Sequence, residues 1–168
     1  MEFMEVVRRR RSVRSYRPDP VPQEKVDYVL EAARLAPSWA NGQCWTFVVV
    51  TDPKVKHDLA AAGNEWIEGA PVIIAACADA KQSGTKGDQG YYLLDIGIAM
   101  EHLVLAAAEQ GLGTCWIGWF DEQMAKQALR VPEAIRLVAT TPLGYPDEEP
   151  EGRPRKSLAE IVRRDRWG

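Results

Sequence analysis

The chain has 168 residues, a formal net charge of −3, 46% hydrophobic residues and 27% charged residues. These values predict one folded domain over residues 1–168 and exclude a largely disordered protein, because enough apolar material is present to offset chain entropy. The acidic balance argues against general attraction to nucleic acid or anionic lipid, and no apolar run approaches the roughly 20 residues that a membrane span needs.

The N-terminal residues do not match a secretory signal, since residues 2 and 5 are glutamates and no apolar segment follows them. We therefore expect a cytoplasmic protein without a membrane partner. The three cysteines, Cys44, Cys77 and Cys115, are far apart and odd in number, which predicts buried free thiols rather than disulfides. His57 and His102 are isolated in the sequence, so no metal site is expected.

The first third of the chain predicts two helices, a polar loop and a strand. A short helix is expected over residues 1–10, and a second begins at Pro22 and is ended by Pro37. Residues 37–45 contain polar groups and two tryptophans, which is typical of a loop. The β-branched run at 46–51 predicts a strand.

The rest of the chain continues the alternation of helices and strands. A helix capped by Asp52 and reaching about Ala62 is followed by a strand at 72–78 and a polar loop at 79–90. The remaining predicted elements are a long helix at 91–110, a strand at 114–117, a helix at 121–129, a strand at 135–141, an extended proline-rich tail and a short helix at 157–163.

This order predicts an α+β fold with a mixed central sheet of about four to five strands flanked by helices, because the first strand comes only after two helices. The helix at 91–110 is apolar almost all the way round. Such a helix must be buried, either in the centre of the domain or at a subunit interface.

Arginines are concentrated in two places on this acidic chain. Six of them occur between residues 8 and 17, and a second basic cluster occupies residues 153–156. One interpretation is a solvated helix end, and another is an anion clamp in which arginine forks and the Ser12 hydroxyl hold a phosphate. Nucleic-acid binding is a third interpretation, and it lacks any known reader motif.

Two further segments are candidates for ligand contacts. The side-chain amides of Gln43 and Asn64 match the donor and acceptor edge of a pyrimidine-like ring. Gly118 allows close approach to the backbone and is followed by two aromatic residues that could enclose a flat ligand. The alternative for the second segment is an ordinary core strand followed by a turn.

Four segments together resemble the FMN-dependent nitroreductase family. They are the Arg-Arg-Ser-Val-Arg run at 10–14, the loop Ala-Pro-Ser-Trp-Ala-Asn-Gly-Gln-Cys-Trp at 36–45, the segment Gly-Leu-Gly-Thr-Cys-Trp-Ile-Gly at 111–118, and Leu-Gly-Tyr-Pro at 143–146 followed by the basic cluster at 153–156. Two departures are Cys44, where the family usually has proline, and Ile117, where many members have an acidic residue.

The resemblance implies a domain-swapped homodimer with FMN bound at the subunit interface. Arg10, Arg11, Ser12 and Arg14 match the N-terminal flavin motif, in which Arg10 and Ser12 would hold the phosphate with Arg153 and Arg155, and Arg14 would reach the pyrimidine side. The remaining site residues implied are Pro37 and Ser38 from the partner chain, Asn64 at the pyrimidine edge, and the backbone N–H of Gly118, together with that of Ile117, facing flavin N5.

The function that the resemblance implies is ping-pong hydride transfer from NADH or NADPH, through flavin N5, to a small-molecule acceptor such as a nitroaromatic or a quinone. No catalytic side chain is expected, because the cofactor supplies the chemistry. One alternative is another flavin reaction on the same fold: reductive dehalogenation, flavin fragmentation or heterocycle oxidation. A different alternative is a small anion- or nucleic-acid-binding module built on the arginines.

Overall fold

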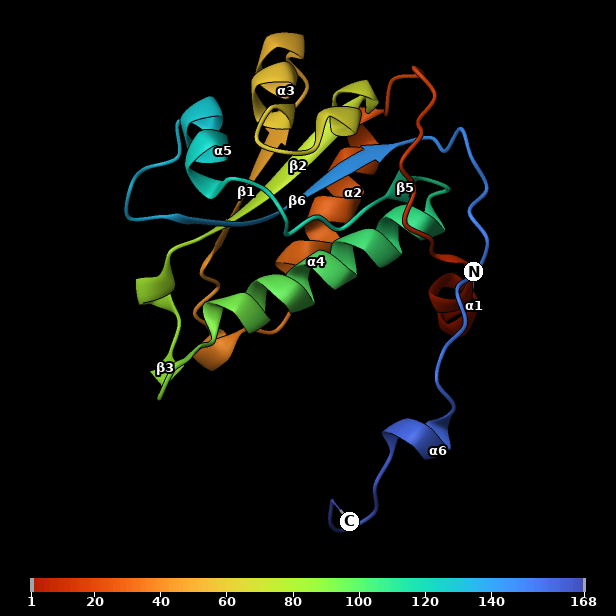
Figure 1. The fold of residues 1–168 in the computed structure, drawn as a ribbon, viewed down its shortest axis with the longest axis vertical. Coiled ribbons are helices and arrows are strands. Elements are labelled where there is room, and N and C mark those ends of the chain that lie inside the picture. The colour runs from red at the N-terminus through yellow and green to blue at the C-terminus, as the bar shows by residue number, and fades with distance from the viewer. Residues whose placement is uncertain (1, 168) are drawn as a thin grey trace.

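The computed structural model describes residues 2–167 and places helices on both faces of a four-stranded sheet (Figure 1). The order across the sheet is β1 (Trp45–Val50), β2 (Val72–Ala78), β6 (Arg136–Gly144) and β5 (Gly113–Thr114). The helices are α1 (Phe3–Arg9), α2 (Gln23–Arg34), α3 (Pro53–Ala60), α4 (Tyr92–Glu109), α5 (Glu122–Leu129) and α6 (Leu158–Ile161).

The predicted α+β fold with a sheet of about four to five strands is confirmed. All three strand pairs of the sheet are antiparallel. The sheet is therefore antiparallel and not mixed as expected, and the one parallel pairing among residues 2–167 is an isolated bridge between Ser12 and Thr114. The segment predicted as a loop at 79–90 also contains a single 3-10 turn, Ala80–Gln82, and a small hairpin of β3 (Thr85–Lys86) and β4 (Gln89–Gly90).

The central strand β2 separates two hydrophobic cores. All seven of its residues are buried, and successive side chains of a strand point to opposite faces. Ile74 and Ala76 belong to the core that contains residues of α2 and α4. Ile73 and Cys77 belong to the core that contains residues of α3 and α5. The cysteines are buried and free, as the sequence predicts.

The strand predicted at 114–117 is shorter than expected, and Pro142 gives the reason. Ile117 and Thr140 exchange two backbone hydrogen bonds of 2.9 Å, so the next pair of this type along the ladder would join Cys115 to Pro142. Proline has no N–H to give. The Cys115 amide instead donates to Thr141 Oγ1, at 3.2 Å, and the ladder is interrupted there.

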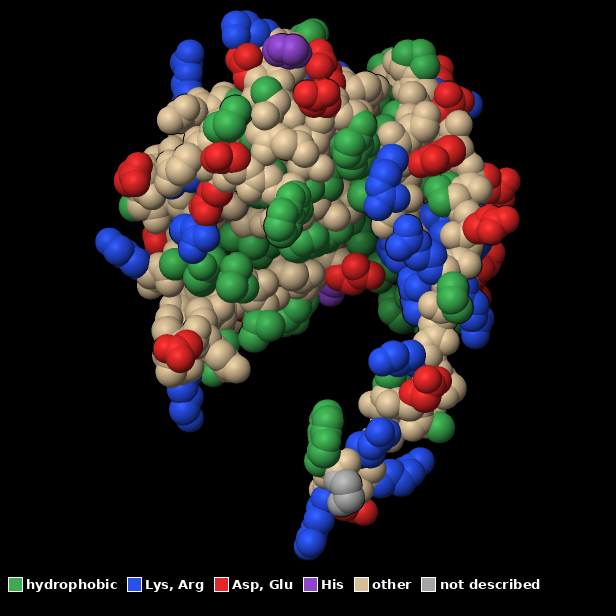
Figure 2. Space-filling view, viewed as in Figure 1, with side chains coloured by type: hydrophobic (Ala, Val, Ile, Leu, Met, Phe, Trp, Pro, Cys, Tyr) green, Lys and Arg blue, Asp and Glu red, His purple; other side chains and the backbone are tan. Residues whose placement is uncertain are grey.

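The long helix α4 is covered by its own chain on one side only. Ile96, Met100 and Leu103 are fully buried in the core. Leu94 and Ile98, one turn apart, remain 59% and 40% exposed, and Figure 2 shows hydrophobic side chains over this part of the surface. The fold of a single chain therefore buries one side of α4, as predicted, and leaves apolar side chains on its other side exposed.

The N-terminal arginine segment runs beside the start of the tail. The Val13 amide donates to the carbonyl of Thr114, and the Arg17 amide donates to the carbonyl of Tyr145, both at 2.9 Å. From residue 151 to residue 167 the tail is exposed, and Figure 1 shows it leaving the body of the molecule with α6. Within residues 2–167 no helix is both long and apolar enough to cross a membrane.

Candidate functional site

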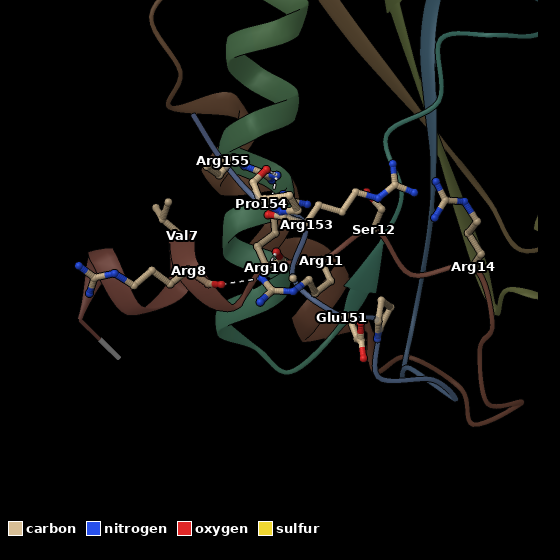
Figure 3. Close-up of a pocket in the computed structure, with 12 residues that line it drawn as sticks. Val7, Arg8, Arg10, Arg11, Ser12, Arg14, Glu151, Arg153, Pro154 and Arg155 are labelled. Carbon is tan, nitrogen blue, oxygen red and sulfur yellow. Dashed lines mark hydrogen bonds between the residues drawn. The ribbon is translucent and has the colours of Figure 1, made fainter. Parts of the chain in front are cut away.

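The two basic clusters line one cavity of about 780 Å³ (Figure 3). Val7, Arg8, Arg10, Arg11, Ser12 and Arg14 contribute from the N-terminal side, and residues 150–155 contribute from the tail. Six of the lining side chains are arginines, whereas Glu151 is the acidic one. The fold of a single chain thus brings clusters more than 130 residues apart in the sequence to one cavity.

Backbone pairing explains why the clusters meet. Tyr16 forms an antiparallel bridge with Pro146, and the Asp147 amide donates to the carbonyl of Ser15 at 3.0 Å. The Glu148 carboxylate also accepts hydrogen bonds from the backbone amides of Arg14 and Ser15. These contacts align the chain so that the tail turns past the arginine segment immediately after Glu148.

Most of the positive charge in the cavity has no acidic partner. Among the described residues, neither Arg10, Arg14 nor Arg153 lies within salt-bridge distance of a carboxylate. The guanidinium of Arg11 is instead engaged within the protein, because its Nη1 donates to the backbone carbonyls of Arg8 and Arg10 at 2.6 and 3.0 Å. Its guanidinium also packs on Gly152, where an added Cβ would lie 2.9 Å from Nη2.

This donor set fits a phosphate group. Arginine forks offer charge-assisted hydrogen bonds in fixed geometry, and Ser12 adds a neutral donor from the same cavity wall. Like charges left together without a counterion repel each other, so an anion is the ligand that such a cavity favours. Figure 3 shows Arg14 approaching from the side opposite to Arg8, which extends away from the other arginines.

A second, smaller cavity of about 360 Å³ lies beside Gly118. It is lined by residues 62–63 and 118–121. Trp119 is 89% exposed there, and Asn64 Nδ2 donates to its carbonyl oxygen at 2.7 Å. The predicted residues Asn64 and Gly118 are therefore neighbours in space, and an aromatic face is available next to them.

The two backbone amides predicted to face a flavin differ in availability. The Ile117 amide donates to the carbonyl of Thr140 within the sheet, which corrects the expectation that it could also donate to a ligand. Among the bonds between described residues, the Gly118 amide has no acceptor. Gly118 is exposed, so its N–H is the candidate donor of this segment.

One extended segment connects the arginine cavity to Gly118. Ser12 pairs with Thr114 at one end, and Gly118 lies four residues further along. An extended chain rises roughly 3.3 Å per residue, so the two ends are up to about 13 Å apart. An elongated ligand with an anionic end and a flat end could follow this segment.

Pro37 and Ser38 lie elsewhere. Ser38 Oγ accepts from the Gln43 amide at 2.9 Å, and the neighbouring Trp39 amide donates to Asp95 near the start of α4. Ala108, near the other end of α4, lines a hollow together with Arg10. Thirteen helical residues at about 1.5 Å each separate the two places by roughly 20 Å. A single chain therefore does not bring Ser38 to the arginine cavity.

Two residues of this arrangement were not predicted from the sequence. Glu148 stands among other acidic residues in a proline-rich tail, so nothing distinguishes it there. Asp95 did leave a signal, because it is the one charged residue in the apolar run 92–100. A lone carboxylate in a buried helix needs hydrogen-bond donors, which would have marked it as a structural node.

Comparison with known proteins identifies the family. The family model described as the nitroreductase family matches residues 7–63 and 55–145, which is most of the chain. The chain belongs to the nitroreductase family. Curated family relatives include the NADH dehydrogenase of Thermus thermophilus, 32% identical over 92% of this chain and 91% of that protein, and the FMN reductase [NAD(P)H] of Bacillus subtilis, 33% identical over 86% and 66%.

Solved structures of the family agree with the fold. A nitroreductase family protein from Clostridium novyi NT is 38% identical, with a TM-score of 0.85 over 100% of this chain and 96% of that one. An FMN-dependent nitroreductase from Clostridium difficile R20291 is 27% identical, with a TM-score of 0.86 over 98% and 99%. Other relatives have different names: iodotyrosine deiodinase 1 of Sus scrofa and 5,6-dimethylbenzimidazole synthase of Rhodospirillum rubrum.

Proposed function

We propose that this protein is an FMN-dependent NAD(P)H oxidoreductase that reduces small nitroaromatic or quinone-type acceptors. The observation behind the proposal is the convergence of Arg10, Ser12, Arg153 and Arg155 on one cavity, in which the three arginines have no salt-bridge partner among residues 2–167. Family membership supports it, because relatives are named FMN reductase and FMN-dependent nitroreductase.

In this proposal the site residues bind three different parts of FMN. Arg10, Ser12, Arg153 and Arg155 bind the FMN phosphate, and Arg11 braces the cavity through its contacts with backbone carbonyls and Gly152. Arg14 faces the pyrimidine side, where a fixed positive charge stabilises negative charge on the ring. Asn64 and the Gly118 amide lie at the opposite end of the 114–118 segment and orient the ring.

We further propose that the active unit is a homodimer. Pro37 and Ser38 lie roughly 20 Å along α4 from the arginine end of the same chain. The exposed apolar side chains of α4, including Leu94 and Ile98, offer a surface on which a second copy can pack. Packing of that kind allows residues 37–38 of one copy to reach the arginine cavity of the other.

FMN, when bound, would supply the redox chemistry by taking a hydride from a nicotinamide cofactor and passing electrons to the acceptor. The chain supplies position and charge instead of an acid or a base. Exposed Trp119, beside Gly118, provides an aromatic face on which a flat donor or acceptor can stack. No side chain is assigned as a catalytic acid, base or nucleophile.

The test begins with protein purified without added flavin. We expect a yellow protein whose released chromophore has the mass of FMN, in a ratio near one per chain. NADH or NADPH should reduce it in the absence of oxygen, and a nitroaromatic or a quinone should reoxidise it. A colourless protein that fails to bind added FMN would refute the proposal.

The main alternative is another flavin reaction. It is favoured by the relatives named iodotyrosine deiodinase 1 and 5,6-dimethylbenzimidazole synthase, which are 31% and 32% identical to this chain. The same yellow protein distinguishes the two. Failure of both NADH and NADPH to reduce bound FMN, together with dehalogenation or flavin breakdown under reducing conditions, would favour the alternative.

A further inference from the structure

Residues 38–43 form a loop with a strained backbone. The φ angles of Ala40, Asn41 and Gln43 are 46°, 57° and 48°. These values lie in the left-handed region of backbone conformation, which disfavours residues other than glycine. Ala40, Asn41 and Gln43 are three of five non-glycine residues with positive φ among residues 2–167. Strain of this kind persists only where surrounding contacts hold it, and it clusters at functional sites.

The carboxylate of Asp95 holds this loop from the inside. Asp95 is 3% exposed. Its Oδ1 accepts from the Trp39 amide at 2.8 Å, and its Oδ2 accepts from Ser83 Oγ at 2.7 Å and from Cys44 Sγ at 3.6 Å. One side chain therefore connects both ends of the loop to the segment 79–84 and to the first turn of α4.

Cys44 stands where the family usually has proline, and it adds a donor that proline lacks. Burial, and next the negative charge of Asp95, raise the pKa of the Cys44 thiol to about 11. The thiol is therefore protonated at neutral pH and can donate to Asp95. The Cys44 carbonyl in addition accepts from the Asp79 amide at 2.9 Å.

Close packing against residues 79–84 completes the support. A Cβ at Gly42 would lie 2.2 Å from the Gln82 carbonyl oxygen, and a Cβ at Gly84 would lie 2.3 Å from Trp39 Cε2. Neither position has room for a side chain. The inner side of the loop is thus fixed by two close contacts, one between Gly42 and Gln82 and one between Trp39 and Gly84.

The outer side of the same loop is free. Ala40, Asn41 and Gln43 are exposed, Trp39 is 48% exposed, and Pro37, directly before the loop, is exposed as well. A loop that is held on one side and open on the other is prepared to meet a partner without further ordering, which lowers the entropy cost of binding. The proposed partner is the arginine cavity of a second copy.

We infer that Asp95 is a positioning residue that holds loop 38–43 in its strained conformation, so that the loop completes the FMN site of the neighbouring subunit. The inference rests on the proposed function. Asp95 touches neither cofactor nor acceptor in this scheme, and it acts through Trp39 and Cys44. A purely structural Asp95 would stabilise the start of α4 and leave flavin affinity unchanged.

The decisive variant is Asp95→Asn. The amide is nearly the same size but neutral, so the hydrogen bonds from Trp39, Ser83 and Cys44 lose their charge-assisted character, and an NH₂ group takes the place of one of the two acceptor oxygens. We expect faster hydrogen exchange in residues 38–43, FMN binding weaker by about tenfold, and a raised KM for the acceptor, because small displacements of positioning groups have large effects. Ser83→Ala, which removes one donor only, should show the same pattern more weakly.

The matched control is Glu122→Gln. Glu122 also accepts three hydrogen bonds at the start of a helix, two from Arg136 and one from the Leu137 amide, but it belongs to α5. It should lower thermal stability without changing FMN affinity or acceptor KM. Ser83→Ala is the variant to measure if Asp95→Asn fails to fold.

The outcomes separate the two proposals. If wild-type protein binds no FMN, the proposed function fails. If wild-type protein binds FMN, and Asp95→Asn and Ser83→Ala bind it with wild-type affinity and wild-type acceptor KM, the positioning role is wrong while the proposed function stands. Weaker FMN binding in these variants but not in Glu122→Gln supports the positioning role.

Discussion

The Glu148 carboxylate accepts a hydrogen bond of 3.1 Å from the backbone amide of Ser15, and it accepts a second from the amide of Arg14. An acidic side chain thus occupies the edge of the most basic region of the molecule, where Figure 2 shows Lys and Arg side chains gathered at the base of the tail. The contact joins the N-terminal segment to the start of the tail. The negative charge itself works against anion binding.

Glu148→Ala distinguishes alignment from charge. If only charge mattered, removal of a carboxylate near the arginines would tighten phosphate binding. We expect the opposite, namely FMN affinity weaker by about threefold to tenfold, with a stability loss of about 1 kcal/mol for exposed hydrogen bonds. Flavin fluorescence titration measures the affinity. Glu149→Ala makes the same change in charge one residue away and should weaken binding less.

Replacement of Arg10 and Arg155 together by alanine should release FMN while the fold remains intact. Both line the cavity and neither has a carboxylate partner among the described residues, so their loss removes ligand contacts and not internal ion pairs. Visible absorbance and circular dichroism check the two parts of this expectation. Arg163→Ala with Arg164→Ala removes equal charge from the distal tail. Full flavin content in the Arg10/Arg155 variant would refute the phosphate assignment.

Leu94→Glu should convert the proposed dimer to a monomer without unfolding it. Leu94 is 59% exposed on α4, so a carboxylate there is solvated in the free chain and is buried only against a second copy. Light scattering coupled to size exclusion measures the mass. Met124→Glu, at a residue 45% exposed on α5, should keep the dimer. Leu103, fully buried, is unsuitable for this test because glutamate there would disrupt the core.

The buried thiols should be unreactive in the native protein. Burial raises the pKa of Cys77 to about 11, and burial together with Asp95 raises that of Cys44 to about 11, from an ordinary value of 9.0. Folding therefore favours the protonated thiols, and their contribution to stability is complete below about pH 9 and lost as pH rises to about 11. Iodoacetamide at pH 8 should label neither thiol until denaturant is added. Rapid native labelling of Cys77 would contradict its burial in the core between β2 and α5.

Much of the fold was accessible from local patterns. The strand at 72–78 lies where its unbroken apolar run predicts it, because a strand covered on both faces needs no polar side. The helix predicted at 91–110 is α4 to within one residue at each end. The length of the strand predicted at 114–117 was overestimated. Its ladder is interrupted at Pro142, which lacks an N–H and lies 25 residues or more away in the sequence, so a local pattern does not reveal the interruption.

The sequence by itself determined the chemical inventory of the candidate site: arginines and a serine at one end, basic residues in the tail, an amide at Asn64 and a glycine at 118. These depend on residue type and on short-range patterns that composition and spacing reveal. Only the tertiary structure decided which of these groups lie together and are available to bind a ligand, because that depends on long-range backbone pairing. It brought the tail beside Arg14 through Glu148, bound the Ile117 amide to Thr140 while leaving that of Gly118 without an acceptor in the described chain, and buried Asp95 under a strained loop.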